Sequence, residues 1–225
     1  MVFLLSSLTY APRVALRNAA LTFILSTTPL LAEPLTLVAF GDSLTQGYGL
    51  PTDQGFVPQL QAWLTAQGED VTVVNAGVSG DTTAGGVSRL EWTLTPEVDA
   101  MIVTLGGNDL LRGIDPATSR ANLDTIVQTA TDASLPVLLV GMQAPGNYGP
   151  DFKASFDAIY PDLSTTYQTL LAPSFFAALT EDNPDPLAAT AFMQPDGIHP
   201  NAEGVAKIVA NLGPQVRDLL ALARN

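Results

Sequence analysis

Residues 35–44 read Leu-Thr-Leu-Val-Ala-Phe-Gly-Asp-Ser-Leu, and this stretch gives the first indication of the fold. Its first six residues are mostly apolar and predict a short buried β-strand. Gly41 then lets the backbone turn without a side-chain clash. Ser43 therefore lies between the end of a buried strand and the start of a helical segment. Four further apolar runs predict strands in the same way: Val71–Asn75, Ala100–Leu105, Val137–Met142 and, more weakly, Phe175–Leu179.

Longer amphipathic segments separate these apolar runs. Their helical spacing predicts helices near residues 55–67, 84–92, 117–132, 152–171 and 203–222. Short buried strands that alternate with helices are typical of a parallel sheet covered on both faces. We therefore predict an α/β protein with three layers, α/β/α, formed by a single domain over residues 33–225. In such folds the ligand binds outside the carboxyl ends of the strands.

The first 32 residues differ in composition from the rest of the chain. They contain no acidic residue, and Arg13 and Arg17 precede a mainly apolar run from Ala19 to Leu31. A basic segment, an apolar run and a small residue at the boundary, here Ala32, are the parts of a secretory signal peptide. We expect this segment to be removed on export, which makes the mature protein periplasmic or secreted. An ordinary N-terminal helix is the alternative interpretation.

The composition excludes several classes of function. The 225 residues include 9 Lys and Arg against 22 Asp and Glu, a formal charge of −13. Nucleic-acid binding is not expected, because it depends on cationic side chains that displace counterions from phosphates. The chain has no cysteine, which excludes disulfides and thiol nucleophiles. His199 is its single histidine, so multi-histidine metal centres are excluded as well.

Polar residues suited to catalysis follow two of the predicted strands. Ser43 enters a helix, whose first N–H groups have no partner within the helix and suit a developing oxyanion. Asn108 lies in the turn Gly106-Gly107-Asn108-Asp109, where its amide is a donor that never changes charge. Both residues also have a structural interpretation, because serine and asparagine commonly cap helices.

A glycine-rich turn, Gly77-Val78-Ser79-Gly80, follows the second predicted strand. It begins like the nucleophile elbow G-x-S-x-G, but Asp81 stands where the second glycine belongs. Ser79 is therefore not the expected nucleophile. The glycines instead suit a backbone that approaches a ligand closely and points N–H groups at it.

A second pair of reactive side chains lies near the C-terminus. Asp196 and His199 are three residues apart, in a turn bounded by Pro195 and Pro200. This spacing lets the carboxylate reach the imidazole and fix its tautomer. Together with Ser43, the segments supply a nucleophile, a base, an orienting acid and oxyanion donors, which are the groups that acyl transfer needs.

These segments resemble the four motif blocks of the SGNH (GDSL) hydrolase family, in family order: Gly41-Asp42-Ser43-Leu44, Gly80 in its Ser-Gly-Asp turn, Gly106-Gly107-Asn108-Asp109 and Asp196-Gly197-Ile198-His199-Pro200. Smaller stretches such as Val74-Asn75-Ala76 and Ile159-Tyr160-Pro161 resemble the bacterial branch of multifunctional thioesterase I, lysophospholipase and arylesterase enzymes. The resemblance implies a flavodoxin-like sheet of five parallel strands. It also implies a mechanism without a metal or an organic cofactor.

The resemblance further implies the role of each residue. Ser43 would be the nucleophile, His199 the general base and Asp196 its orienting partner. The oxyanion hole would consist of the backbone N–H groups of Ser43 and Gly80 and the side-chain amide of Asn108. The implied activity is that of a serine esterase that hydrolyses carboxylic esters through an acyl-enzyme.

The substrate is less well indicated by the sequence. Two stretches resemble the family's mobile loops beside the acyl groove. The candidate groove residues are Leu111, Ile114, Pro145, Tyr148 and Phe192. Each of them could equally be a residue of ordinary core or surface packing. Ala144 stands where the family branch often has a bulkier apolar residue, which leaves the preference for long acyl chains open. A negatively charged enzyme repels acyl-CoA. We therefore rank aryl esters, short-to-medium acyl esters and lysophospholipids above thioesters, and we expect a monomer with at most transient membrane-surface contact.

Two alternative functions remain. A polysaccharide O-deacetylase of the same fold would need an aromatic sugar-binding surface, and both tryptophans, Trp63 and Trp92, fall on helical patterns that we expect to lie in the core. A non-catalytic binding module would have lost a residue of the catalytic set, and none is missing.

Overall fold

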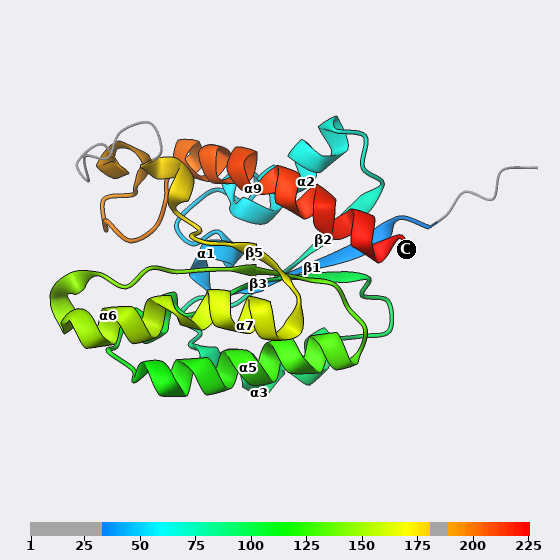
Figure 1. Ribbon diagram of the computed structural model, residues 1–225. Coiled ribbons are helices and arrows are strands. Elements are labelled where there is room, and N and C mark those ends of the chain that lie inside the picture. The colour runs from blue at the N-terminus through cyan, green and yellow to red at the C-terminus, as the bar shows by residue number, and fades with distance from the viewer. Residues whose placement is uncertain (1–32, 181–188) are drawn as a thin grey trace, which may run out of the picture. The chain divides into compact units, whose positions relative to one another are not determined.

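A five-stranded parallel sheet forms the centre of the protein in the computed structural model, which describes residues 33–180 and 189–225 (Figure 1). The expected signal peptide lies outside the described residues. The strands are β1 (Leu35–Gly41), β2 (Val71–Gly77), β3 (Ala100–Thr104), β4 (Val137–Val140) and β5 (Leu170–Ala172). Their order across the sheet, β2-β1-β3-β4-β5, is the flavodoxin-like order. The α/β prediction is confirmed.

Helices cover both faces of this sheet, as Figure 1 shows. On one face lie α2 (Phe56–Ala66) and α9 (Ala202–Ala223), which pack against each other. On the other lie α3 (Thr83–Thr93), α5 (Pro116–Asp132) and α7 (Ile159–Tyr167). The short helices are α1 (Ser43–Gln46), α4 (Gly107–Leu111) and α6 (Pro150–Asp157), and the 3-10 turns are η1 (Thr52–Gln54), η2 (Gly146–Tyr148), η3 (Ala177–Leu179) and η4 (Thr190–Phe192). Over residues 33–180 and 189–225, no helix is long and apolar enough to cross a membrane.

The strand sequences explain their places in the sheet. Every residue of β3 and β4 is buried, because both strands lie inside the sheet and are covered by helices on both faces. The edge strand β2 alternates between buried and exposed positions over its first four residues. Gln61 of α2 covers its free edge: its amide donates to the Val71 carbonyl at 3.0 Å and accepts from the Val73 N–H at 2.8 Å. The covered edge is closed to pairing with another strand at these positions.

The carboxyl ends of the first three strands lie level with one another. Gly41, at the end of β1, is in register with Gly77 of β2 and Thr104 of β3. A Cβ at Gly41 would overlap the Thr45 side chain and lie 2.7 Å from the Thr104 carbonyl oxygen. A Cβ at Gly77 would overlap the backbone nitrogen of Gln46. Only glycine allows the turn after β1 to lie this close to its neighbours.

The prediction of the fifth strand is wrong in position. We expected it over Phe175–Leu179, whereas β5 is the three-residue segment Leu170–Ala172. Phe175 is fully buried, but it belongs to the loop after the strand, where its N–H donates to the Gly141 carbonyl. An apolar run that fills the core from a loop has the same composition as a short strand, and the sequence pattern does not separate the two.

The expected helix over residues 152–171 is in fact two helices followed by β5. Pro161 has no N–H to donate to the preceding turn, so α6 ends at Asp157 and α7 begins at Ile159. Gln168 then ends α7 in the left-handed conformation, with φ of 56°. The expected core position is also wrong for Trp92, whose side chain is 86% exposed, whereas Trp63 is half-buried against Gly213 of α9.

Candidate active site

A continuous chain of hydrogen bonds joins Ser43, His199 and Asp196. The Nε2 atom of His199 lies 2.8 Å from the Ser43 Oγ, and its Nδ1 lies 2.7 Å from the Asp196 Oδ2. A carboxylate can only accept hydrogen bonds, so the imidazole proton lies on Nδ1 and Nε2 is free to accept the serine proton. The structure thus brings together a hydroxyl, a base and an acid that come from opposite ends of the sequence.

Local backbone geometry holds the Asp196 carboxylate in its ionised form. Its Oδ1 accepts the N–H groups of Ile198 at 2.9 Å and His199 at 3.0 Å. These bonds and the one to the imidazole lower the pKa of Asp196 to about 2, the His199 N–H being the largest cause. Asp196 therefore stays negatively charged throughout the neutral range, where it fixes the orientation of the imidazole.

Ser43 is not the residue that caps its helix. Asp42 is the N-cap of α1, and its Oδ1 accepts the Leu44 N–H at 3.0 Å. The Ser43 hydroxyl is consequently left for His199. As the first residue of the helix, Ser43 also has a backbone N–H without an intrahelical acceptor. The capping interpretation that the sequence left open thus applies to the neighbouring aspartate.

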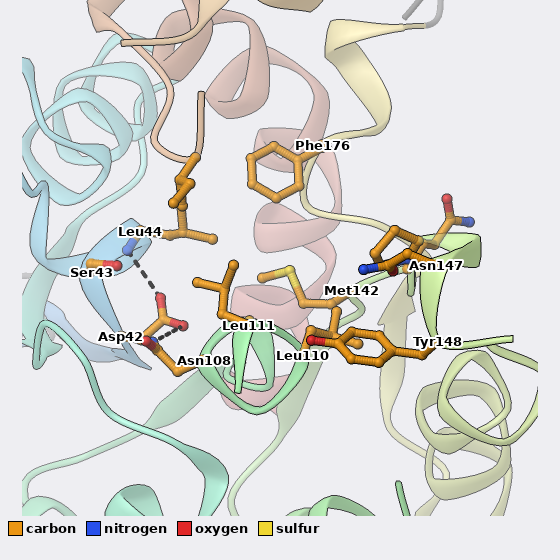
Figure 2. Close-up of a pocket in the computed structure, with 14 residues that line it drawn as sticks. Asp42, Ser43, Leu44, Asn108, Leu110, Leu111, Met142, Asn147, Tyr148 and Phe176 are labelled. Carbon is orange, nitrogen blue, oxygen red and sulfur yellow. Dashed lines mark hydrogen bonds between the residues drawn. The ribbon is translucent and has the colours of Figure 1, made fainter. Parts of the chain in front are cut away.

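The same Asp42 carboxylate orients the side chain of Asn108. The Asn108 Nδ2 donates to the Asp42 Oδ2 at 3.2 Å, and both residues lie beside Ser43 in Figure 2. Asp42 is 1% exposed, and this burial raises its pKa to about 6. Asn108 does not cap α4, whose N-cap is Gly106. Its amide is instead fixed at the cleft, with one N–H on Asp42 and a second N–H remaining.

Gly80 lies on the turn after β2, with φ of 85°, a conformation that favours glycine. Its backbone N–H donates to no acceptor within residues 33–180 and 189–225, whereas its carbonyl accepts from Arg112 Nη2 at 2.8 Å. The neighbouring Ser79 hydroxyl donates to the Gln46 side chain at 3.0 Å and has no base beside it. The turn thus offers a free N–H rather than a nucleophile.

An apolar cleft of about 390 Å³ opens beside Ser43 (Figure 2), a volume typical of small-molecule sites. Three of the predicted groove residues, Leu111, Pro145 and Tyr148, line it. Leu110, Gln143 and Asn147 also line it, and they belong to the stretches Leu110–Ile114 and Gln143–Tyr148 that resemble the family's mobile loops. The rest of its wall consists of Leu44, Met142, Phe176 and Ile198, beside Asp42, Gly107 and Asn108. Met142 ends the apolar run Val137–Met142, and its place at a strand end was the available signal. Phe176 gave no such signal, because it lies in the run that we expected to be the fifth strand.

The groove prediction is wrong for Ile114 and Phe192, which do not line this cleft. Gly113, with φ of 62°, turns the chain after α4, and the Ile114 N–H donates back to the Asp109 carbonyl. Phe192 lies under α9, with its ring 4.9 Å from the Lys207 Nζ and its carbonyl bonded to the Asn201 N–H. Both side chains are half-buried.

No metal-binding cluster accompanies the cleft. In the part of the chain that the structure describes, no three His, Cys, Asp or Glu side chains are grouped so that they could hold an ion. The arrangement around Ser43 instead contains the elements of nucleophilic acyl transfer: a hydroxyl bonded to a base, an ionised acid behind the base, and amide donors nearby.

Comparison with known proteins shows the family of this chain. Residues 39–207 match the model of the GDSL-like lipase/acylhydrolase family. The chain belongs to this family. Three curated proteins are similar to this chain: Esterase TesA of Pseudomonas aeruginosa, an arylesterase of Vibrio mimicus and thioesterase 1/protease 1/lysophospholipase L1 of Escherichia coli K12. Their identities are 38%, 34% and 33%, over 92%, 88% and 82% of this chain and 100%, 96% and 85% of the relatives.

Solved structures of GDSL-type enzymes have the same fold. AlinE4, an SGNH-hydrolase family esterase, is 40% identical, with a TM-score of 0.67 over 84% of this chain and 98% of that chain. The crystal structure of TesA is 38% identical, with a TM-score of 0.73 over 82% of this chain and 99% of that chain. The resemblance to SGNH (GDSL) hydrolases is confirmed, and this member of the family is a hydrolase of ester bonds.

Asp42→Asn tests the role of the buried carboxylate. We expect kcat to fall at least about tenfold, because an amide nitrogen facing Asn108 cannot accept its N–H.

The same variant tests the raised pKa of Asp42 through stability. The difference in unfolding free energy between the wild type and Asp42→Asn should change with pH: the wild type should lose about 3 kcal/mol relative to the variant as the pH rises through 6. The reason is that the unfolded carboxyl ionises near 3.8, whereas the folded one keeps its proton to about 6. Urea unfolding at several pH values measures this, and parallel stability curves would contradict it.

Proposed function

We propose that the protein is a serine esterase that works through an acyl-enzyme formed on Ser43. The observation that carries this proposal is the hydrogen-bond chain from the Ser43 Oγ through His199 to Asp196, at 2.8 and 2.7 Å. In the first step His199 Nε2 takes the hydroxyl proton as Oγ attacks the ester carbonyl. The imidazolium then gives this proton to the leaving alkoxide or phenoxide. In the second step water attacks the acyl-enzyme, with His199 again as base, and the carboxylic acid is released.

The oxyanion of each tetrahedral intermediate is bound by amide donors. These are the backbone N–H groups of Ser43 and Gly80 and the side-chain N–H of Asn108. The bond from Asn108 to Asp42 supports this assignment, because it fixes the amide before substrate arrives. Donors that are already oriented stabilise developing charge without reorganising during the reaction. No metal or organic cofactor takes part in these steps.

The cleft favours an apolar acyl or aryl group. Its wall beside Ser43 includes the side chains of Leu111, Met142 and Phe176. Two of the relatives carry the names arylesterase and thioesterase/lysophospholipase. We assign aryl esters, short-to-medium acyl esters and lysophospholipids as substrates of this chain. Acyl thioesters rank below them, because the formal charge of −13 repels anionic acyl-CoA. We propose a monomer, in which one chain supplies all the groups assigned to the mechanism.

Ser43→Ala tests the proposed nucleophile. With nitrophenyl esters from acetate to palmitate, we expect the wild type to hydrolyse several members of the series. The variant should lose at least about 10³-fold in kcat, because no acyl-enzyme forms. The chain-length optimum of the wild type then measures how much acyl chain the cleft accepts.

Ser79→Ala is the matched control for this experiment. It removes a hydroxyl that has no base beside it, so the acyl-enzyme can still form and kcat should fall far less than in Ser43→Ala. Hydrolysis by Ser43→Ala at the wild-type rate would exclude the serine mechanism. A wild type that cleaves no ester of the series would overturn the proposed activity.

Asn108→Ala tests the side-chain donor. Loss of one oxyanion donor typically lowers kcat by about 10²–10³, and we expect this range with KM nearly unchanged. Asn147→Ala is the control, because Asn147 lines the same cleft but is assigned no role. Steady-state kinetics on one nitrophenyl ester compares the two variants. A loss below about threefold for Asn108→Ala would remove Asn108 from the oxyanion hole.

Export is a further part of the proposal, supported by the composition of residues 1–32. We expect a bacterial host that expresses the full chain to yield mature protein that begins at Glu33. N-terminal sequencing of the protein from the periplasm or medium measures this. A chain shortened to residues 33–225 should stay inside the cell, and recovery of the uncut full chain in the cytoplasm would contradict export.

A further inference from the structure

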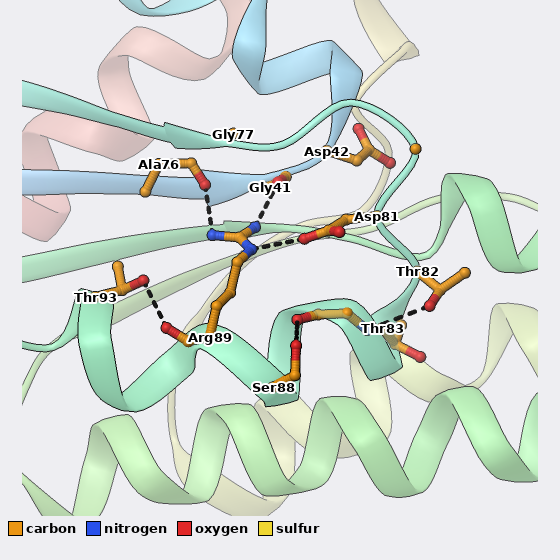
Figure 3. Close-up of polar contacts among 12 residues, drawn as sticks. Gly41, Asp42, Ala76, Gly77, Asp81, Thr82, Thr83, Ser88, Arg89 and Thr93 are labelled. Carbon is orange, nitrogen blue, oxygen red and sulfur yellow. Dashed lines mark hydrogen bonds and ion pairs between the residues drawn. The ribbon is translucent and has the colours of Figure 1, made fainter.

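Arg89 of α3 has no part in the mechanism above, yet it contacts the segments that carry two of the proposed oxyanion donors (Figure 3). Its guanidinium donates three hydrogen bonds to groups from three different segments. Nη2 donates to the Gly41 carbonyl at 2.8 Å, Nη1 to the Ala76 carbonyl at 2.8 Å, and Nε to the Asp81 Oδ2 at 2.6 Å. One side chain thus joins the end of β1, the end of β2 and the turn after β2.

Each acceptor lies close in sequence to a proposed donor. Gly41 precedes the Asp42-Ser43 turn by one residue, and Asp81 directly follows Gly80. The two segments also meet directly, since the Val78 N–H donates to the same Gly41 carbonyl at 3.0 Å and the Asp81 N–H closes the turn on the Val78 carbonyl at 3.1 Å. Bonds that converge on the Gly41 carbonyl and on Asp81 therefore contribute to the position of Gly80 relative to Ser43, beside the bonds from Ser79 to Gln46 and from Arg112 to the Gly80 carbonyl.

The environment of Arg89 is specific to a guanidinium. Its side chain is 20% exposed and that of Asp81 is 19% exposed, so this ion pair is more shielded than one at the surface. The guanidinium lies over the Phe40 ring, with Cζ 4.0 Å from the centroid. Gly85 has no side chain, and a Cβ there would lie 2.7 Å from the Asp81 Oδ1. A lysine ammonium could not make the planar, forked set of bonds that reaches two carbonyls and a carboxylate together.

The same helix is also tied to the segment of the third donor. At the start of α3 the Thr83 hydroxyl and N–H both donate to the buried Asp109 carboxylate, at 2.6 and 2.8 Å. Asp109 directly follows Asn108 in α4. Thus α3 contacts the segments of all three donors, two of them through Arg89.

We propose that Arg89 is a positioning residue for the oxyanion hole, which holds the Gly80 turn against the Ser43 turn through Gly41, Ala76 and Asp81. This inference rests on the proposed function, since it assigns Arg89 to the same site. Its consequence is kinetic. Donors displaced by a fraction of an ångström still admit the substrate but stabilise the oxyanion less, so kcat falls while KM changes little.

The experiment compares Arg89→Lys and Arg89→Met with the control Arg217→Lys in the full chain. Arg217 of α9 pairs with Glu69 at 2.7 Å, away from the cleft, and provides an arginine–carboxylate contact of the same kind. Active sites are counted by stoichiometric phosphonylation with a fluorophosphonate, so that kcat refers to folded enzyme only. Thermal unfolding and amide hydrogen exchange are measured on the same samples.

We expect kcat per active site to fall about 10- to 100-fold in both Arg89 variants, with KM within about threefold of the wild type. Arg217→Lys should keep the wild-type kcat. The midpoint of the pH–rate profile should not move, because Arg89 does not contact His199 or Asp196.

Asp81→Asn keeps the shape of the Asp81 side chain and should lower kcat less than the Arg89 variants do. In the Arg89 variants the amides of Val78 and Asp81, whose hydrogen bonds hold the Gly80 turn, should exchange faster than in Arg217→Lys.

A purely structural role would give a different result. If the Arg89 variants only unfold at lower temperature, or yield fewer active sites with wild-type kcat for each, the positioning role is wrong. If the wild type itself hydrolyses no ester, the proposed function fails separately. Amide exchange then decides the positioning role alone, and unchanged exchange at Val78 and Asp81 in Arg89→Lys would overturn it.

Discussion

The close approach of backbone segments at the carboxyl edge of the sheet is the constraint on which the rest of the site depends. Gly41 and Gly77 lie opposite each other in register, and a side chain at either one would collide with the turn after β1. This approach lets the turn that carries Ser43 lie against the turn that carries Gly80. Because the strands are parallel and end at one level, β3 delivers Asn108 to the same edge. Two residues without side chains thus allow the site to assemble.

Buried carboxylates then fix what the glycines bring together, at a cost in stability. Asp42 caps α1 and orients the Asn108 amide, but its burial raises its pKa to about 6, so near neutral pH its charge is held in a site that disfavours it. Asp109, also buried, holds Thr83 and Ser119 in place. An uncharged amide or hydroxyl group has only one acceptor oxygen, whereas an ionised carboxylate has two. A carboxylate accepts several N–H and O–H donors at once, which explains why an already acidic chain buries more of them here.

The sequence allowed the residues at strand ends to be predicted because their placement follows from the parallel register alone. Ser43, Gly80 and Asn108 each follow a short apolar run, and the fold brings such positions to one edge. Features that depend on packing could not be predicted in this way. Ile114 and Phe192 are apolar and near motif residues, yet neither lines the cleft: Ile114 follows a left-handed turn at Gly113, and Phe192 packs beside Lys207 of α9. Arg89 gave no signal, because two of its three partners are backbone carbonyls, far from it in the sequence.

The distance between Ser43 and His199 depends on contacts that the motifs do not contain. The turn from Gln194 to His199 is held by its own hydrogen bonds. Asp196 accepts two N–H groups of the turn, and the Gln194 N–H donates to the His199 carbonyl. It is tied to the loop after α1 by the Gln194 amide, which donates to the Tyr48 carbonyl at 2.8 Å. Gly49 leaves room for this amide, since a Cβ there would overlap it. The Tyr48 ring lies 4.7 Å from the imidazole, centroid to centroid. His199 is therefore aligned by the loop that follows the helix of Ser43, and this contact couples the proposed base to the proposed nucleophile despite their separation in sequence.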